Sequence, residues 1–218
     1  MNILSEVLHP INSRFAFIDA DINSIVNEFI EWQKPIVANA GNDLVVSDVN
    51  LDLESCLRSL CPLTVGEIRK YLFIPTKNNW VMFLDNSHLG TDRTAPEVMC
   101  EFLKTKMIYV TISPLGNLFE LYESGKLVRL VGVSKESTWK FYEIGNLLDF
   151  EDVVSYKKRV IKDRLTPENV IHYLRYFNID ILNEEYLKFK SSRLIAKKGK
   201  MFKSTKELSL IEAQSFFK

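Results

Sequence analysis

The spacing of apolar residues in the first third of the chain predicts alternating strands and helices. Residues 15–18 form an apolar run that predicts a short strand, and apolar positions between residues 22 and 30 recur every three or four residues, as in an amphipathic helix. Pro35 is expected to end this helix, because proline has no amide hydrogen and its ring clashes with the preceding turn. Residues 44–47 then predict a strand and residues 53–60 a short helix.

Two stretches predict β-hairpins of similar appearance. Residues 70–76 and 80–84 flank one polar turn, and residues 126–133 and 139–144 flank another. Both return strands begin with a tryptophan. In one interpretation the two hairpins are an internal repeat, and in the other they are independent, because tryptophan suits strands in any case.

A helix and two more strands are predicted between the hairpins. The run Thr94-Ala95-Pro96-Glu97 has the form of a capping box, in which Thr94 caps the helix and Glu97 bonds back to it. Residues 107–112 and 118–122 then predict strands on either side of a turn.

The pattern becomes helical from about residue 150. Residues 153–161 predict one helix, and Thr166-Pro167 predicts the start of another, which Asn178 is expected to close. Residues 193–196 predict a strand and residues 208–217 a final helix.

These elements indicate an α+β fold with a mainly antiparallel sheet and with helices near the N-terminus, in the middle and in the C-terminal third. No low-complexity linker divides the sequence, so we expect residues 1–218 to form a single domain. Apolar residues make up 46% and charged residues 26% of the chain. These globular values exclude disorder as the main state.

Charge is distributed unevenly along the chain. The formal net charge is zero, but residues 1–155 hold 13 basic and 21 acidic side chains, a net charge of −8, and residues 156–218 hold 15 and 7, a net charge of +8. The basic C-terminal region is expected to fold back on the acidic body. The alternative is a contact with nucleic acid through residues 156–206, since clustered Lys and Arg are its electrostatic signature.

The three cysteines, Cys56, Cys61 and Cys100, have neither an even count nor a CxxC spacing, and we expect them to be small buried residues. The N-terminus lacks the features of a secretory signal, and no run of 18 apolar residues occurs. A cytoplasmic protein without membrane contact is therefore the expectation.

The polar segment Asp85–Arg93, between a strand and a helix, carries the candidate site. Its partner-binding candidates are Asp85, Asn86, His88, Asp92 and Arg93. In an alternative, Asp85, His88 and Asp92 form a general base or ligate a metal. In the simplest interpretation these residues only hold the turn.

Other chemical motifs are absent from the sequence. It has no phosphate-binding loop and no GxSxG nucleophile. Trp80 and Trp139 are expected in the core, and His172 on the solvated side of its helix. We therefore expect no catalytic residue, no metal ligand and no cofactor.

Short runs follow one another between residues 70 and 180: Trp80-Val-Met-Phe-Leu-Asp85-Asn86, Gly90-Thr91-Asp92, Met107-Ile-Tyr-Val-Thr-Ile-Ser, Trp139-Lys-Phe, Phe150-Glu151, Tyr156-Lys157, Arg159, Asp163-Arg164 and Ile179-Asp180. This succession resembles small bacterial α+β proteins that are similar to immunity proteins of contact-dependent or polymorphic toxin systems. The resemblance implies a rigid, charge-complementary binding surface and a toxin domain as partner, and it assigns no functional residue.

The expected function is therefore that of a non-enzymatic protein-binding protein, with toxin neutralisation as its specific form. One alternative is a hydrolase or metal-dependent enzyme that uses the Asp85–Asp92 loop. The other is nucleic-acid binding through the basic C-terminal region.

Overall fold

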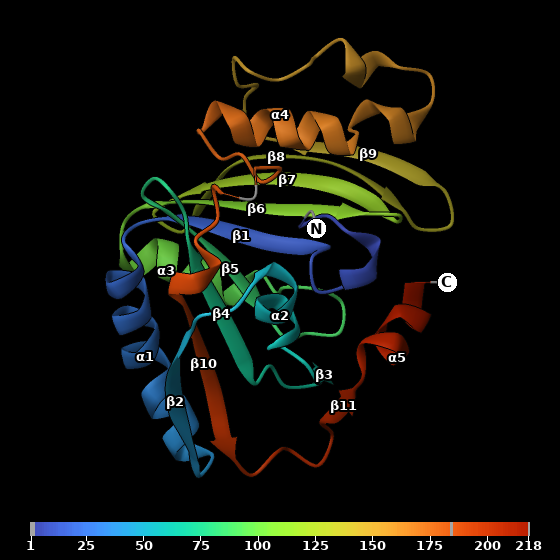
Figure 1. The fold of residues 1–218 in the computed structure, drawn as a ribbon. Coiled ribbons are helices and arrows are strands. Elements are labelled where there is room, and N and C mark those ends of the chain that lie inside the picture. The colour runs from blue at the N-terminus through green and yellow to red at the C-terminus, as the bar shows by residue number, and fades with distance from the viewer. Residues whose placement is uncertain (1–2, 184, 218) are drawn as a thin grey trace.

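The computed structural model describes residues 3–183 and 185–217. Nine strands form one antiparallel sheet in the order β2-β10-β4-β5-β1-β6-β7-β8-β9, and β3 (Leu63–Val65) pairs with β11 (Lys206–Leu208) beside it (Figure 1). The strands of the large sheet are β1 (Arg14–Asp19), β2 (Asn42–Val49), β4 (Lys70–Pro75), β5 (Trp80–Asp85), β6 (Lys106–Ser113), β7 (Gly116–Glu123), β8 (Lys126–Lys135), β9 (Trp139–Ile144) and β10 (Ser192–Gly199).

Helices lie on both faces of this sheet. The α-helices are α1 (Ile22–Asn39), α2 (Leu53–Arg58), α3 (Thr94–Phe102), α4 (Pro167–Tyr176) and α5 (Leu210–Gln214). The 3-10 helices are η1 (Glu6–Leu8), η2 (Ser155–Lys157), η3 (Ile161–Arg164), η4 (Phe189–Ser191) and η5 (Ser215–Phe217). The arrangement confirms the predicted α+β class and antiparallel sheet, with helices near the N-terminus, in the middle and in the C-terminal third.

Two hydrophobic clusters show which helices cover which face. Along β1, Phe15 and Phe17 belong to the cluster that includes α2, α4 and α5, whereas Ala16 and Ile18 belong to the cluster that includes α1 and α3. All four side chains are 0% exposed. Successive strand residues point to opposite faces, and here both faces are covered, so the predicted apolar run has no polar alternation.

The sheet changes direction between its two halves. Figure 1 shows β1 and β6–β9 running across the view, while β2, β4 and β10 run down it. Helix α4 packs on β6 and β7, and α3 packs on their opposite face and on β1, whereas α1 packs against β2 and β4 (Figure 1). Because of this change in strand direction, α1 does not cover β6–β9.

The basic C-terminal region enters the sheet. Strand β10 pairs with β2 on one side and with β4 on the other, so a segment from the end of the sequence lies between two early strands. Arg193 on β10 forms an ion pair with Asp48 on β2, with 2.7 Å between Nε and Oδ1. Sequence periodicity predicts the strand at 193–196 but not this position.

Pro35 does not end the first helix, contrary to the prediction. Helix α1 continues through it to Asn39. Ile25, Phe29 and Val37 are buried along one side of the helix. The turn after the proline therefore buries Val37, and this tertiary packing outweighs the local cost of proline.

The α-helix predicted at residues 153–161 is also wrong. The 3-10 helices η2 and η3 occupy this segment instead. The Asp152 carboxylate accepts hydrogen bonds from the Ser155 N–H and hydroxyl, and Tyr156 donates its hydroxyl to Glu151. Side-chain acceptors of this kind compete with helical backbone hydrogen bonds.

The two predicted helix starts have different outcomes. The Thr94–Glu97 capping box does not form: α3 has Arg93 at its N-cap, and Asp92 accepts from the Thr94 N–H at 2.8 Å. At α4, Thr166 caps the helix as predicted, and Asn178 follows its end in a left-handed conformation with φ 58°.

The remaining predicted elements are present. Both hairpins form, β4–β5 inside the sheet and β8–β9 at its edge. Trp80 is buried and Trp139 is half-buried. The predicted final helix is shorter, because α5 passes into η5 after Gln214. Cys56 and Cys100 are buried and Cys61 is half-buried, and all three are free thiols. Within residues 3–183 and 185–217, no helix combines the length and the apolar character needed to cross a membrane.

Candidate functional site

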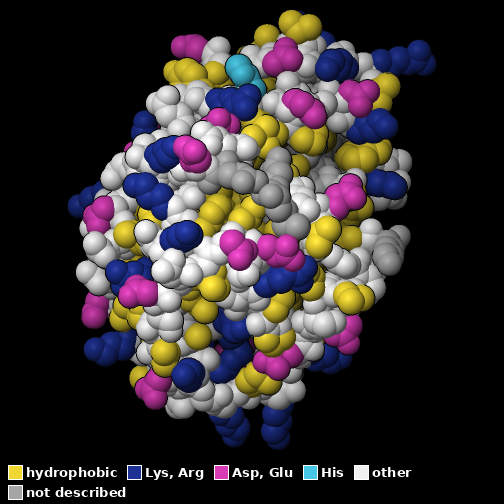
Figure 2. Space-filling view, viewed as in Figure 1, with side chains coloured by type: hydrophobic (Ala, Val, Ile, Leu, Met, Phe, Trp, Pro, Cys, Tyr) yellow, Lys and Arg dark blue, Asp and Glu magenta, His cyan; other side chains and the backbone are white. Residues whose placement is uncertain are grey.

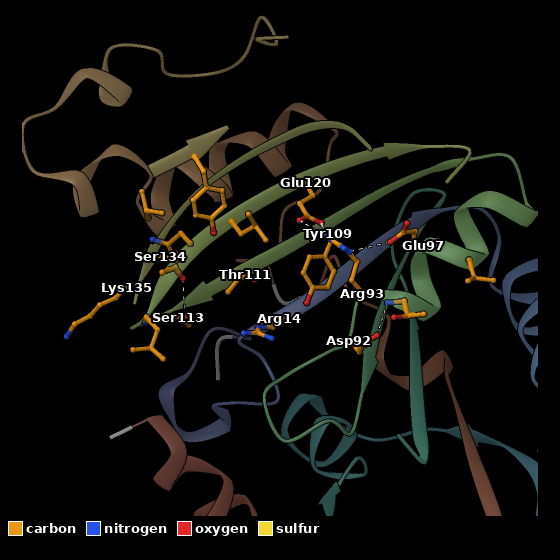
Figure 3. Close-up of a pocket in the computed structure, with 18 of the residues that line it drawn as sticks. Arg14, Asp92, Arg93, Glu97, Tyr109, Thr111, Ser113, Glu120, Ser134 and Lys135 are labelled. Carbon is orange, nitrogen blue, oxygen red and sulfur yellow. Dashed lines mark hydrogen bonds and ion pairs between the residues drawn. The ribbon is translucent and has the colours of Figure 1, made fainter. Parts of the chain in front are cut away.

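A hollow opens on the face of β6–β9 that lies opposite α4. Its cavity volume is about 680 Å³, and its lining comes from the start of β1, the N-terminal half of α3 and strands β6–β9 (Figure 3). On the other face of the same strands, Ile108, Phe119 and Val131 belong to the buried cluster that includes α4. The hollow is therefore the part of this face that α3 leaves open.

Register places polar and small residues side by side on this open face. Thr111 stands opposite Arg14 on β1 and Leu118 on β7, and Gly132 on β8 stands opposite Leu118 and Tyr142. A Cβ atom at Gly132 would lie 2.7 Å from the Tyr142 ring and 2.8 Å from Leu118. Glycine at this position lets the Tyr142 ring lie close to the sheet.

The end of the hollow near α3 is acidic and neutralised in part by Arg93 (Figure 3). Arg93 Nη1 lies 3.0 Å from Glu120 Oε1, and its Nε lies 3.3 Å from Glu97 Oε2. Tyr122 donates its hydroxyl to Glu120 at 3.0 Å. Burial raises the pKa of Glu120, although Arg93 and Tyr122 oppose this shift. Glu120 is thus a buried carboxylate held by two fixed partners.

The opposite end of the hollow carries cations and hydroxyl groups. Figure 3 places Ser113, Ser134 and Lys135 at this end, with Arg14 between them and Asp92. Within residues 3–183 and 185–217, the Arg14 guanidinium and the Lys135 ammonium form no ion pair, and the hydroxyls of Thr111 and Ser134 make no hydrogen bond. These four groups remain available to a ligand.

Asp85, one of the predicted site residues, has a structural position. Its side chain is 0% exposed, and its two oxygens accept from the backbone N–H groups of Ser87 and Asp92, each at 2.9 Å. Burial raises the pKa of Asp85 to about 7, although these two hydrogen bonds oppose the shift. The carboxyl group holds the 86–92 loop in place and does not reach the surface.

Asn86 is also buried, at 1% exposure. Its Oδ1 accepts from the N–H groups of Arg69 and Lys70, and its Nδ2 donates to the Pro62 carbonyl at 3.0 Å. All of these bonds join backbone segments. Asn86 therefore connects the chain before β4 to the end of β5 and presents no free polar group.

His88 does not line the hollow on β6–β9. Its ring packs edge-on against Phe216, with 5.3 Å between ring centroids, and its backbone N–H donates to the Thr64 carbonyl. His88 and Asp92 together line a second, smaller hollow of about 410 Å³, and Asp92 and Arg93 lie at the rim of the hollow on β6–β9. Asp92 therefore lies between the two hollows, whereas Asp85 and Asn86 are buried.

The enzyme alternative needs Asp85, His88 and Asp92 to act together. The Asp85 oxygens are occupied by backbone donors, and the His88 ring contacts an aromatic residue of the C-terminal segment. Among the residues that the structure describes, no three His, Cys, Asp or Glu side chains are grouped as metal ligands. His172 is exposed, as the sequence predicted.

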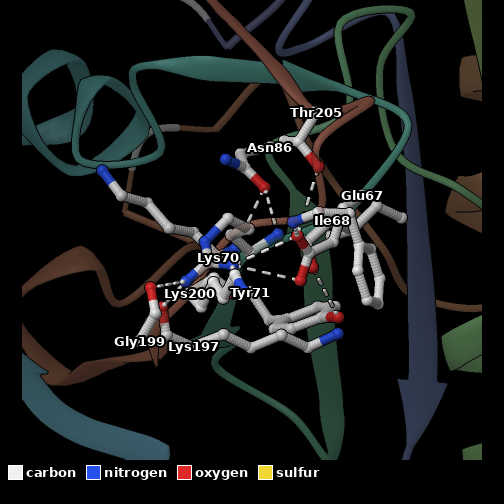
Figure 4. A network of polar contacts seen from close by, with 11 residues as sticks. Glu67, Ile68, Lys70, Tyr71, Asn86, Lys197, Gly199, Lys200 and Thr205 are labelled. Atoms are coloured by element: carbon white, nitrogen blue, oxygen red, sulfur yellow. Dashed lines mark hydrogen bonds and ion pairs between the residues drawn. The ribbon is translucent and has the colours of Figure 1, made fainter. Parts of the chain in front are cut away.

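A polar network holds the chain after β10 (Figure 4). Arg69 Nη1 lies 3.1 Å from Glu67 Oε1, and its Nη2 donates to the carbonyls of Lys197 and Gly199 at 3.0 and 3.2 Å. Thr205 donates its hydroxyl to Glu67. Because these buried charges are paired with each other and with backbone carbonyls, the network has a structural role.

Basic side chains gather where this segment ends. Figure 2 shows Lys and Arg side chains projecting at the lower end of the molecule, where β10 ends in Figure 1. Burial lowers the pKa of Lys197, whose ammonium lies 5.5 Å from the centre of the Tyr71 ring. Lys198, Lys200 and Lys203 are exposed. The positive charge of the C-terminal region is therefore partly folded into the sheet and partly on the surface.

The sequence did not single out most residues of the hollow, including Arg14, Tyr109, Thr111, Glu120 and Ser134. One signal was present. Glu120 interrupts the apolar run Leu118–Tyr122, where a buried strand position would normally be apolar. The other signals depend on which face of the sheet lacks a helix.

Comparisons with models of protein families, with curated proteins and with solved structures find no match to this chain.

Proposed function

We propose that this chain is a non-enzymatic protein-binding protein and that a partner polypeptide binds the hollow on the open face of β6–β9. One observation carries the proposal: β6 and β7 are covered by α4 on one face, whereas on the other face α3 covers only part of the strands and leaves a hollow with charges of both signs. A preformed surface of this kind binds without a large ordering cost.

The chemistry of the hollow supports binding over catalysis. Glu120, its most buried carboxylate, is engaged by Arg93 and Tyr122 and is not free to accept a proton from a substrate. Asp92 accepts from the Thr94 backbone and so supports α3. Fixed charges at opposite ends suit the recognition of a partner whose charges are complementary.

Toxin neutralisation is the specific form of this proposal. The resemblance of residues 70–180 to immunity proteins implies it, and the net charge of −8 over residues 1–155 is compatible with a basic toxin domain.

The location of binding can be tested by photo-crosslinking. Benzoylphenylalanine placed at Ser134, inside the hollow, should yield one dominant protein crosslink in a lysate of cells that encode the chain. The matched control is the same label at Ser47 on edge strand β2. Equal crosslinking at both positions would contradict the proposal.

Charge reversal tests the same surface. Glu101→Lys, on the lining of the hollow, should weaken capture of the crosslinked protein, whereas Glu31→Lys, on an exposed position of α1, should not. If the captured protein is toxic when expressed alone, co-expression of the wild-type chain should restore growth and Glu101→Lys should restore less. Unchanged growth with the wild-type chain would reject the immunity role.

Nucleic-acid binding is a second candidate, favoured by one observation. Lys157, Lys158, Arg159 and Lys162 are exposed and form no ion pair with the described residues. Binding through them requires log K to fall with log salt by about 0.9 for each phosphate contact on duplex DNA. An affinity that does not change with salt would reject it.

A further inference from the structure

We propose that Arg14 is the centre of a carboxylate-binding site in the hollow. This inference rests on the proposed function and names the group that a bound partner contributes. The shared chemistry is a carboxylate, from either an acidic side chain or a polypeptide C-terminus.

Arg14 differs from every other arginine that is not fully exposed. Within the described chain, Arg69 and Arg129 bind carboxylates and carbonyls, Arg193 binds Asp48, and Arg164 donates to the Lys158 carbonyl. Arg14 is a half-buried residue, and its guanidinium has neither kind of partner among these residues. A planar guanidinium matches a carboxylate through two parallel hydrogen bonds.

The backbone around Arg14 fixes the site. The Arg14 carbonyl accepts from the Thr91 N–H, and the Ser13 carbonyl accepts from the Ile112 N–H at 2.8 Å. Tyr109, on the neighbouring strand, donates its hydroxyl to the Thr91 carbonyl at 2.6 Å. Asp92, the acidic residue at the end of the 86–92 loop, accepts a hydrogen bond from the Thr94 N–H. These hydrogen bonds therefore fix the backbone that carries the Arg14 side chain.

Neighbouring groups favour a singly charged anion. Thr111 stands opposite Arg14 on the neighbouring strand, so its hydroxyl can donate to a bound carboxylate. Ser134 and Lys135 line the same hollow on β8, and the Lys135 side chain points away from Arg14, so that it adds positive charge only at a distance (Figure 3). At the other end of the same hollow, Glu97 and Glu101 repel anions, and this repulsion grows with the charge of the ligand. A carboxylate thus fits better than a doubly charged phosphate.

Three capped peptides test the site by NMR. Ac-Ala-Asp-Ala-NH2 offers only a side-chain carboxylate, Ac-Ala-Ala-Ala-OH only a C-terminal one, and Ac-Ala-Asn-Ala-NH2 none. We expect at least one carboxylate peptide to shift the Arg14 Nε–Hε resonance and the Thr111 amide in a saturable way, and the Asn peptide to shift neither. Which peptide binds identifies the source of the carboxylate.

Variants show whether Arg14 is responsible. Arg14→Met should weaken the peptide at least about tenfold, and Arg14→Lys should restore only part of the affinity, because a lysine cannot bind bidentately. Arg175→Met, at an exposed arginine outside the hollow, is the matched control. Equal shifts from the Asn peptide, or an affinity unchanged by Arg14→Met, would overturn the inference.

The crosslinking experiment separates the two proposals. If neither carboxylate peptide shifts the NMR resonances but the label at Ser134 still crosslinks to a protein, the carboxylate site is rejected and the protein-binding function stands. If a carboxylate peptide shifts the resonances in a saturable way but no protein is crosslinked, the carboxylate site stands and the protein-binding function is rejected.

Discussion

The two faces of strands β6–β9 place charged groups in opposite situations. On the face under α4, Arg129 and Glu151 form an ion pair with 2.7 Å between Nη2 and Oε2, and their side chains are 1% and 0% exposed. On the open face, Arg93 and Glu120 form an ion pair at 3.0 Å, and Arg93 is 47% exposed. Both carboxylates are buried, with Glu120 at 3% exposure, so the two pairs differ in the cation, which is buried in Arg129 and half-exposed in Arg93.

The covered pair is embedded in further hydrogen bonds. Arg129 donates to both Glu151 oxygens and to Glu143, and Glu151 also accepts from the Tyr156 hydroxyl and the Leu148 N–H. Burial alone would lower the pKa of Arg129, but these carboxylates raise it. This network ties the segment after β9 to β8 and is a structural element.

The open face keeps its polar groups accessible. Arg93 joins the rim to the floor of the hollow, while Arg14 has no anionic partner among the described residues. The Arg129 guanidinium is thus fully engaged within the chain, whereas the Arg14 guanidinium is not. Substitutions on the two faces should therefore differ in their effect on unfolding.

The largest effect is expected for Arg129→Met. It leaves the Glu151 carboxylate buried without its cation, so we expect a loss of about 3–5 kcal/mol in the free energy of unfolding. Arg93→Met also removes the cation of a buried carboxylate, but Glu120 keeps the Tyr122 hydroxyl and burial already raises its pKa toward protonation, so we expect a smaller loss of about 1–2 kcal/mol. Urea denaturation measures both. Equal losses would show that the two faces do not differ in this way.

The buried carboxyl group of Asp85 should make the free energy of unfolding depend on pH. Because the folded pKa of Asp85 is about 7 against an ordinary value of 3.8, the folded chain keeps a proton that the unfolded chain releases between these values. Stability should therefore fall as pH rises through this window, by about 4 kcal/mol. Asp85→Asn should flatten the dependence in urea titrations, and an Asp85 carboxyl that titrates near 4 by NMR would contradict this.

Two glycines that lie on β7 and β8, Gly116 and Gly132, should differ in how much stability is lost when alanine replaces them. A Cβ at Gly116, where φ is +147°, would lie 2.1 Å from the Val133 carbonyl oxygen, which is backbone. Gly116→Ala should therefore cost about 2–3 kcal/mol through strain. At Gly132 the nearest atoms belong to side chains that can move, so Gly132→Ala should cost about 1 kcal/mol. Thermal unfolding of the two variants measures which of them loses more stability. A larger loss for Gly132→Ala than for Gly116→Ala would contradict this prediction.

The smallest effect is expected for Arg14→Met. Its guanidinium makes no hydrogen bond or ion pair within the described residues, so the free energy of unfolding should change by less than about 0.5 kcal/mol. The measurement is urea denaturation beside Arg193→Met, which loses an ion pair with Asp48. A large loss for Arg14→Met would mean that the residue has a structural role on the open face.

The candidate site could be predicted only in part. Asp92 and Arg93 do lie at the rim of the hollow, so the loop was placed near this surface. Asp85 and Asn86 are buried anchors, because their side chains satisfy backbone groups that a sequence pattern cannot identify. Glu120 and Arg14 come together with the rim through strand register, which depends on pairing between distant segments.

Local sequence determined the elements whose signals lie within a few residues. These are the two hairpins with their polar turns, the Thr166 cap of α4 and the left-handed Asn178 after it. Such signals are sufficient because turn and cap hydrogen bonds join near neighbours.

Only the tertiary structure decided the rest. It placed β10 between β2 and β4, carried α1 through Pro35 and left a hollow beside α3 on one face of β6–β9. The physical reason is the same in each case. The free energy that selects these arrangements comes from burying side chains and pairing strands that lie far apart in the sequence, and no local pattern contains that information.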